Sequence, residues 1–310
     1  MNIHLKKIKL YLNVNWKIAR SESVFKENFI LSMGQFESEI APNIRYGETI
    51  ERIEKEFSEL KSLDNISVMD HWCNSFKNAV NNLDLKIKSN GDITNFLGLE
   101  QVNYALSSFS IPIMNLGDVS DYISINNNYE FYKIKVRNFK DINLVKEVSK
   151  STSAKLRIDA NEGFTSLKEY LIFEKAISDF NIEFIEQPFK SSMLQEYQEL
   201  KRISKFEIIA DESIEDGFDP VNISKQFHGV NIKLMKSGGI ENSFKLIQLA
   251  KKHNLKIMLG CMIESSLGIS EALYLANYAD YVDLDGALLL EKDPYSHLLS
   301  YDRSKIKACF

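Results

Sequence analysis

Acidic and basic side chains end a series of short apolar runs in this sequence, at nearly regular intervals. Successive members are separated by 24, 27, 25 and 22 residues, and they are Lys135, Asp159, Glu186, Asp211 and Lys233. Each interval is about the length of one β-strand with one α-helix. If the runs are parallel strands of one barrel, all five side chains lie at its carboxyl-terminal face, where barrel active sites are found.

Three carboxylates, those of Asp159, Glu186 and Asp211, follow consecutive runs and are therefore expected side by side. Three negative charges at apolar strand ends repel one another, and they are costly to bury unless a cation lies among them. Oxygen ligands with no His or Cys nearby favour a hard ion, and one carboxylate per strand suits Mg²⁺, or Mn²⁺, better than a Ca²⁺ cage. A single aspartate here could be a helix N-cap, but three matched positions predict a metal site.

Two lysines, Lys135 and Lys233, end what would be strands two and six, which lie opposite each other in an eight-stranded barrel. This placement predicts a pair of acid–base groups facing each other across the mouth. Lys133 lies on the same face as Lys135, and we expect each ammonium group to lower the pKa of the other, so that one can act as a general base. The alternatives are a solvated strand end for Lys133 and Lys135, and an ion pair with Asp211 for Lys233.

A second acidic pair, Asp283 and Asp285, ends the last apolar run, with both side chains on one face. That run is three strands away from Asp211, so the pair is not expected to bind the same ion. The two carboxylates indicate a cation in the ligand. A substrate with a carboxylate for the metal, an ammonium group for this pair and a proton-bearing carbon between them would satisfy all of these charges.

Eight apolar or β-branched runs alternate with helical patterns, which predicts parallel βαβ units that close into a (β/α)8-type barrel over residues 103–290. The runs span residues 104–112, 131–136, 155–159, 182–186, 207–211, 229–233, 256–260 and 281–285. Residues 1–102 read as a small α+β unit, with extended runs at 6–12 and 28–32 and helical periods at 49–63 and 67–87. Residues 291–310 contain no further βα unit and are expected to pack on the N-terminal unit or on the barrel's outside.

The composition excludes several classes of protein. With 38 Lys and Arg against 43 Asp and Glu, the net charge is −5, so no basic surface for nucleic acid is expected. No apolar run has the length of a membrane span, and the N-terminus lacks a signal-type apolar core. Three scattered cysteines give no disulfide framework. We therefore expect a cytoplasmic protein with a small-molecule partner and no nucleic-acid or membrane partner.

The series of strand-end motifs resembles that of the enolase superfamily, in its muconate-lactonizing subgroup. The motifs are Lys-x-Lys at 133–135, Asp-Ala-Asn at 159–161, Glu-Gln-Pro at 186–188, Ala-Asp-Glu-Ser at 210–213 and Asn-Ile-Lys-Leu-Met-Lys-Ser-Gly-Gly at 231–239. Within that subgroup, Gly-Cys-Met-Ile-Glu-Ser-Ser-Leu-Gly at 260–268 and the Asp283 and Asp285 pair resemble the dipeptide epimerases. Residues 41–49 fit their capping domain.

This resemblance implies an α+β capping domain over the barrel and a role for each matched residue. Asp159, Glu186 and Asp211 would bind Mg²⁺. Lys135 and Lys233 would be bases on opposite faces of a dipeptide's α-carbon, with Lys133 tuning Lys135. They would move the proton from one face to the other through an enolate. Asp283 and Asp285 would hold the dipeptide's α-ammonium group, and the residues expected to support these groups from behind are Asn161, Glu212 and Glu264.

Substrate specificity is the part of the resemblance with the weakest match. The hairpin at 29–42 and the segment after Asp285 are shorter than is usual for the family. Arg20 lies in the loop that in this family contacts the substrate side chain, and it would favour an acidic one, as in L-Ala-D/L-Glu, unless it is only a surface charge. Lys236-Ser-Gly-Gly is expected to shape the start of a helix rather than to bind phosphate.

Two other functions fit part of the pattern. An o-succinylbenzoate synthase-like lyase could use the same metal and lysines for β-elimination, but Asp283 and Asp285 would then face a substrate without an ammonium group. A non-catalytic, metal-dependent ligand-binding protein would need neither lysine. Barrel enzymes of this type are often homo-oligomers, although the sequence identifies no interface.

Overall fold

Eight parallel strands form the centre of the molecule, and the computed structural model describes residues 2–19, 21–62, 65–214 and 217–309 around and within it. The strands are hydrogen-bonded in chain order, from the first to the last. They are β5 (Phe109–Ile111), β6 (Phe131–Lys135), β7 (Lys155–Asp159), β8 (Ile182–Glu186), β9 (Glu207–Ala210), β10 (Gly229–Lys233), β11 (Lys256–Gly260) and β12 (Tyr281–Asp283). A parallel bridge between Ser107 and Val282 joins the two ends, so the sheet closes into a barrel.

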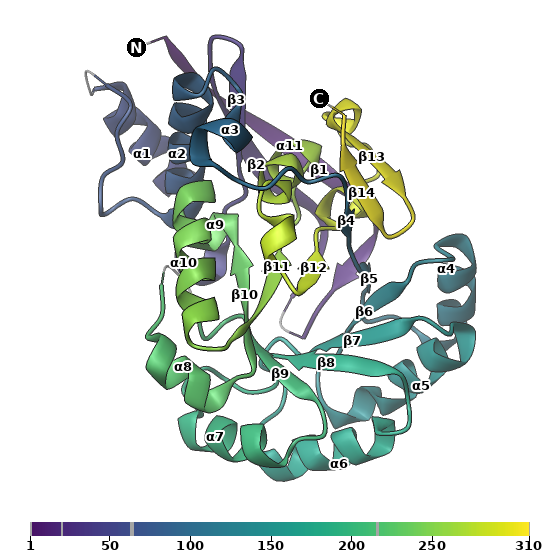
Figure 1. Ribbon diagram of the computed structural model, residues 1–310. Coiled ribbons are helices and arrows are strands. Elements are labelled where there is room, and N and C mark those ends of the chain that lie inside the picture. The colour runs from purple at the N-terminus through teal and green to yellow at the C-terminus, as the bar shows by residue number, and fades with distance from the viewer. Residues whose placement is uncertain (1, 20, 63–64, 215–216, 310) are drawn as a thin grey trace.

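Helices cover the outside of the barrel, as Figure 1 shows. They are α4 (Val119–Ile125), α5 (Ile142–Ser151), α6 (Leu167–Ile177), α7 (Leu194–Ile203), α8 (Pro220–Gln226), α9 (Leu234–Ser237), α10 (Ile240–Lys252) and α11 (Ser266–Leu273). Each longer helix buries one apolar stripe against the strands, as α5 does with Leu144, Val145 and Val148. Side-chain caps define several starts: Ser166 accepts a hydrogen bond from the N–H of Glu169 at the start of α6.

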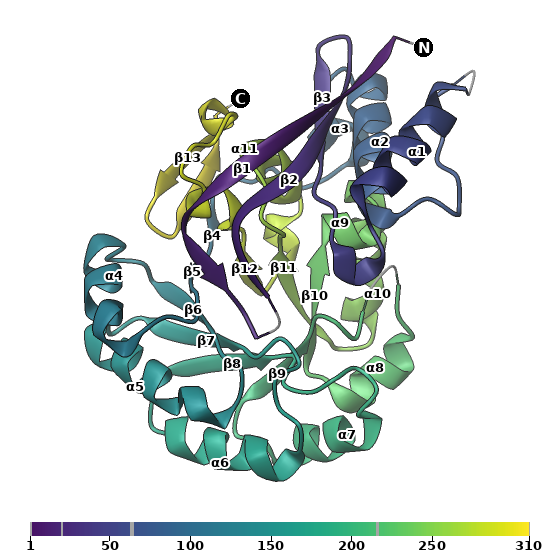
Figure 2. The ribbon, with the colours of Figure 1, turned by 180° about the vertical axis from the view of Figure 1, so that it is seen from behind.

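The N-terminal residues form a separate antiparallel sheet with helices on one face. Its strands, in order, are β1 (Ile3–Lys17), β2 (Glu22–Met33) and β3 (Phe36–Ile40), and its helices are α1 (Ile50–Lys61), α2 (Asn74–Lys88) and α3 (Ile93–Leu97). This unit has its own buried apolar cluster, which includes Phe29, Leu31, Trp72 and Phe76. Figure 2 shows the long β1–β2 hairpin extending from this unit down to the barrel.

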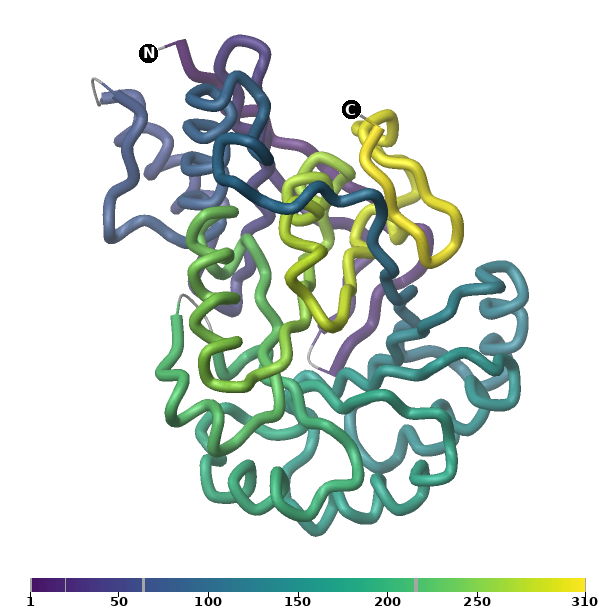
Figure 3. The backbone as a smooth tube through the Cα atoms, viewed as in Figure 1, coloured from purple at the N-terminus to yellow at the C-terminus, as the bar shows by residue number. Residues whose placement is uncertain are grey.

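The C-terminal residues form a hairpin of β13 (Leu299–Asp302) and β14 (Lys305–Ala308), and β14 pairs with the short strand β4 (Ala105–Leu106) just before the barrel. In Figure 3 the yellow C-terminal segment accordingly lies beside the blue segment that leads into the first barrel strand. Leu290 also forms an antiparallel bridge with Leu12 of β1. The tail thus contacts the segment just before the barrel, and the Glu291 N–H donates a hydrogen bond of 2.9 Å to the Tyr11 carbonyl of the N-terminal sheet.

The predicted fold class is confirmed: an eight-stranded α/β barrel follows an N-terminal α+β unit. Some predicted bounds are wrong. The first run, at 104–112, divides into β4 and β5, because β4 pairs with the C-terminal hairpin instead of the barrel. The helix predicted over 67–87 begins at Asn74, and β1 and β2 are longer than their apolar runs. The domain boundaries at 102/103 and 290/291 stay predictions.

In the described part of the chain no helix is long and apolar enough to span a membrane.

Candidate active site

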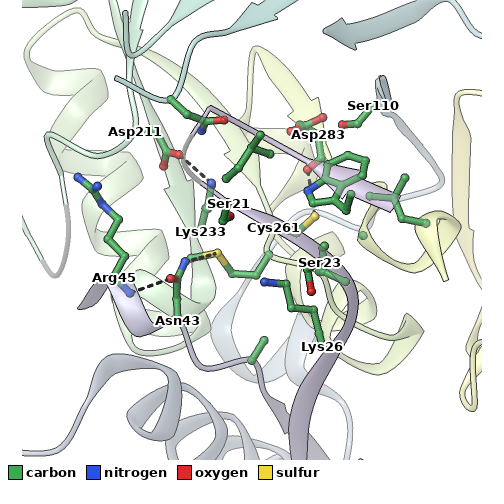
Figure 4. Close-up of a pocket in the computed structure, with 18 of the residues that line it drawn as sticks. Ser21, Ser23, Lys26, Asn43, Arg45, Ser110, Asp211, Lys233, Cys261 and Asp283 are labelled. Carbon is green, nitrogen blue, oxygen red and sulfur yellow. Dashed lines mark hydrogen bonds and ion pairs between the residues drawn. The ribbon is translucent and has the colours of Figure 1, made fainter. Parts of the chain in front are cut away.

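One pocket lies between the N-terminal unit and the carboxyl-terminal ends of the barrel strands, and it holds most of the residues singled out above (Figure 4). The N-terminal unit contributes the β1–β2 hairpin and the segment from Ala41 to Tyr46. The barrel contributes residues of β5, β6, β10 and β12 and of the loops that follow β7, β9, β11 and β12. Because residues distant in sequence meet there, the pocket has the architecture of a barrel active site covered by a second domain.

The three carboxylates of the series are buried at adjacent strand ends. Asp159 and Glu186 are register partners on β7 and β8, and Asp211 directly follows β9. All three are 3% exposed or less. Burial, together with the negative charges of Asp159 and Asp211, raises the pKa of Glu186 to about 7. The three carboxylates are thus close enough to repel one another.

Lysine ammonium groups neutralise this cluster. Lys133 Nζ lies 2.7 Å from Glu186 and 3.1 Å from Asp159, and Lys135 Nζ lies 2.6 Å from Asp159. Asp211 forms ion pairs with Lys233 at 2.8 Å and with Lys236 at 2.5 Å. Within the described ranges, no three Asp, Glu, His or Cys side chains are arranged as a metal site. A cation that binds the carboxylates must therefore compete with these lysines.

The donor chemistry nevertheless fits a hard divalent cation. Asp159, Glu186 and Asp211 offer oxygen ligands on three neighbouring strands, and their mutual repulsion is what a bound cation would relieve. Asn231 on β10 donates a hydrogen bond of 2.7 Å to Glu186 Oε1 and so fixes the orientation of that carboxylate.

Lys135 and Lys233 occupy opposite walls of the pocket, as predicted, because three strands separate β6 from β10 in either direction around the barrel. Burial alone would lower the pKa of Lys233, but Asp211 and Glu186 outweigh it and raise that pKa. The same holds for Lys133, whose pKa the carboxylates of Asp283, Glu186 and Asp159 raise well above the ordinary value despite burial. The predicted lowering of the Lys133 pKa is therefore wrong in this structure.

Asp283, the last residue of β12, and Asp285, two residues later, also reach the pocket, and they differ in their partners and in the pKa of their carboxyl groups. Asp283 forms an ion pair with Lys133 at 2.7 Å and accepts a hydrogen bond from the Ser108 hydroxyl. Asp285 accepts a hydrogen bond of 2.6 Å from the Ser110 N–H. Burial and the charge of Asp283 raise the pKa of Asp285 to about 7. The protein itself thus supplies a cation for Asp283, contrary to the expectation that both aspartates need one from the ligand.

The three residues expected to support the site lie at different depths. Asn161 and Glu212 line the pocket, and the Asn161 N–H donates a hydrogen bond of 3.0 Å to Asp159. Glu264 is buried behind the pocket, where it accepts a hydrogen bond of 2.7 Å from the Met262 N–H. Arg20 lies outside the described residues.

Glu39 of β3 connects the N-terminal unit to the barrel. Its buried carboxylate accepts hydrogen bonds from the N–H groups of Ser265 and Gly268 at 3.1 Å, from the Ser265 hydroxyl and from the Asn28 amide. Ser265 is the N-cap of α11. A carboxylate from one unit therefore binds the start of a helix in the other.

Three further residues at the site were not predicted as site residues from the sequence: Lys236, Arg45 and Lys26. Lys236 donates hydrogen bonds to the Asp211 carboxylate and to the carbonyls of Asp211 and Ile214, so it holds the loop after β9. Its position three residues after Lys233 could have indicated a second buried lysine, since α9 begins at Leu234. Arg45 and Lys26 line the pocket from the N-terminal unit. Nothing in their local sequence indicates which way they face.

Comparison with known proteins gives consistent results. Residues 122–305 match the family described as enolase C-terminal domain-like. The chain is 35% identical over 275 residues to the L-Ala-D/L-amino acid epimerase of Pedosphaera parvula, covering 83% of this chain and 79% of that protein. It is 42% identical over 165 residues to the enzyme of the same name from Flavobacterium johnsoniae, covering 53% of this chain and 49% of that one. The chain thus spans about half the length of the second relative.

Several solved structures of similar fold contain ligands, and two of them illustrate the similarity. The substrate-liganded complex of the L-Ala-D/L-Glu epimerase from Bacillus subtilis has a TM-score of 0.87 and 25% identity, covering 99% of this chain and 96% of that one. The dipeptide epimerase from Cytophaga hutchinsonii, complexed with Mg and D-Ala-L-Val, has a TM-score of 0.88 and 22% identity, covering 99% and 92%.

Proposed function

Because this chain belongs to the enolase superfamily, and within it to the family of the dipeptide epimerases, we propose that it is an isomerase that inverts the α-carbon of a dipeptide's C-terminal residue. The observation that carries the proposal is the pair of lysines, Lys135 and Lys233, on opposite walls of one pocket above three buried carboxylates. Inversion needs a proton removed on one face of a carbon and returned on the other, and this pair is placed for both.

The carboxylates of Asp159, Glu186 and Asp211 would hold Mg²⁺, with Mn²⁺ as an alternative. When bound, such a cation would supply Lewis-acid stabilisation of the negative charge that develops on a substrate carboxylate. Asn231 and Asn161 hold Glu186 and Asp159 in position through the hydrogen bonds described above.

The two lysines would transfer the proton directly. The ion pair with Asp211 keeps Lys233 protonated, so this lysine is ready to donate a proton to the α-carbon. Lys135, on the opposite wall, would take the proton from the other face. In the reverse reaction the two roles exchange. Lys133, enclosed by three carboxylates, is placed to balance charge rather than to reach the substrate.

Asp285 would bind the α-ammonium group of the dipeptide. Its carboxylate faces the pocket, and among the described residues no Lys or Arg side chain forms an ion pair with it. Asp283 would contribute through its charge while it stays paired with Lys133. An ammonium group at Asp285 would replace the missing countercharge and hold the reacting carbon at a fixed distance from both lysines.

The lyase and the non-catalytic binding protein are weaker candidates. An o-succinylbenzoate-type substrate has no ammonium group for the buried Asp285. A binding protein has no use for two lysines on opposite walls.

The test is incubation with Mg²⁺ and a library of L,L-dipeptides in D₂O, followed by mass spectrometry. We expect a gain of one mass unit at the α-carbon of a subset of the dipeptides, with their epimers as products. Lys233→Met should stop epimerisation and leave exchange of one epimer through Lys135. Lys245→Met, at an exposed position of α10, is the matched control and should behave as wild type. Normal epimerisation by Lys233→Met would contradict the two-base mechanism, and a lack of exchange with every dipeptide would favour the lyase.

A further inference from the structure

Lys26 lies on the wall of the pocket that the N-terminal unit provides. It belongs to β2, opposite Leu10 of β1 in the register, and its side chain is partly buried. Figure 4 shows it on the side of the pocket away from Asp211 and Asp283, with its ammonium group directed into the pocket. It therefore faces the space in which a substrate would bind.

The charge of Lys26 is not balanced by the described part of the protein. The other cations that line the pocket each have a carboxylate partner: Lys133 with Asp283 at 2.7 Å, Lys135 with Asp159 at 2.6 Å, Lys233 with Asp211 at 2.8 Å and Arg45 with Glu162 at 3.0 Å. Among the described residues, no carboxylate forms an ion pair with Lys26. Burial lowers the pKa of Lys26, and no neighbouring charge opposes this effect. A partly buried cation without a partner is costly, and an anionic ligand group would remove that cost.

Lys26 lies in the direction in which one substituent of the reacting carbon would point. Once the proton has left, the α-carbon carries three groups in one plane, and Lys135 and Lys233 face the two sides of that plane. In the binding mode of the proposed function, the substrate carboxylate would point to the buried carboxylate cluster, and the peptide nitrogen would lead to Asp285. The third group, the side chain of the C-terminal residue, would then point toward the N-terminal unit, where Lys26 lies.

We propose that Lys26 binds a side-chain carboxylate of the substrate, so that this protein acts on dipeptides whose C-terminal residue is acidic. The inference rests on the proposed function, because it assumes that a dipeptide binds with its α-carbon between the two lysines. The interaction is a charge-assisted hydrogen bond at a partly desolvated position, which corresponds to about a 10- to 100-fold effect on kcat/KM.

The test compares two dipeptides of nearly equal shape and different charge, L-Ala-L-Glu and L-Ala-L-Gln, by α-proton exchange in D₂O with Mg²⁺. The wild type should exchange L-Ala-L-Glu about 10- to 100-fold faster in kcat/KM. Lys26→Met, which keeps most of the length of the side chain and removes its charge, should lose this preference and retain exchange of L-Ala-L-Gln. Lys26→Glu should reverse it in favour of L-Ala-L-Lys. Lys7→Met is the matched control, because Lys7 lies on the adjacent strand, outside the pocket, in an exposed ion pair with Glu27.

The outcomes separate this inference from the proposed function. Loss of the preference for L-Ala-L-Glu in Lys26→Met, and not in Lys7→Met, would support it. Exchange of dipeptides by the wild type without a preference for the acidic one, or a preference that survives in Lys26→Met, would overturn the role of Lys26 and leave the epimerase proposal standing. A lack of exchange with every dipeptide would overturn both.

Discussion

Replacing Glu39 tests whether the contact between the N-terminal unit and the barrel stabilises the protein. Glu39→Ala removes the carboxylate that binds the start of α11 and leaves the buried N–H groups of Ser265 and Gly268 without their acceptor. Part of the loss is offset, because the variant no longer buries a carboxylate beside that of Glu264.

The size of the effect follows from these contacts. A buried donor that loses its partner costs about 1–3 kcal/mol, so two such donors cost about 2–6 kcal/mol before the offset. We therefore expect a loss of about 3 kcal/mol in the free energy of unfolding. For 310 residues, an unfolding entropy of about 2.1 cal/mol/K per residue converts this loss into a melting temperature lower by about 5 °C.

The pH dependence gives a second check. Burial raises the pKa of Glu39 in the folded protein. The stability linked to its protonation is therefore fully present below the pKa of an unfolded glutamate and is lost as the pH rises through the raised folded-state pKa. Glu39→Gln does not titrate at this position, so the melting temperature of the wild type minus that of Glu39→Gln should fall as the pH rises.

The assay is differential scanning calorimetry of the wild type, Glu39→Ala and Glu39→Gln over a range of pH. Glu54→Ala is the control, because Glu54 is an exposed residue on α1 of the same unit. If Glu39→Ala melts at the same temperature as Glu54→Ala, the Glu39 carboxylate does not stabilise the start of α11.

Two further predictions concern the pocket. The pKa of Asp285 is raised to about 7, so its carboxyl group is ionised above that pH. The KM for a dipeptide should therefore fall between about pH 6 and about pH 8, and Asp285→Asn should flatten this pH profile in a steady-state assay. A pH profile of KM that the substitution leaves unchanged would contradict the role of Asp285. Lys236→Met removes the donor to the carbonyls of Asp211 and Ile214. This variant should lower the rate of α-proton exchange about 10- to 100-fold and alter the dependence of that rate on Mg²⁺ concentration. The Lys245→Met control should leave both unchanged, and an unaltered Mg²⁺ dependence in Lys236→Met would count against a positioning role for this lysine.

The barrel could be predicted from the sequence because each of its strands is a short apolar run at a regular interval. The strand-end series is readable for the same reason: Asp159 and Glu186 end their strands in the same register, so their spacing in sequence predicts their closeness in space. The predicted opposition of Lys135 and Lys233 depends only on strand order, and it is correct.

The pairings inside the site could not be predicted, because they depend on distances that only the closed barrel sets. Lys133 and Asp283 are 150 residues apart and meet because the first and last strands join. Together with the carboxylates of Glu186 and Asp159, this contact raises the pKa of Lys133, although burial alone would lower it. The position of Lys26 in the pocket could not be predicted for another reason. Side chains alternate between the two faces of β2, and this alternation does not show which face the barrel covers.

The bridge between Ser107 and Val282 has a consequence for how the protein is made. The Ser108 hydroxyl reaches Asp283 and the Ser110 N–H reaches Asp285, each across 175 residues of chain, only when the last barrel strand docks beside the first. Contacts of such long range form late, since the loop they close has a high entropy cost. A nascent chain on the ribosome that has extended as far as Lys233 thus carries both lysines and all three carboxylates of the series. It lacks Asp283 and Asp285, for which we propose ammonium binding, until residues 281–285 have emerged.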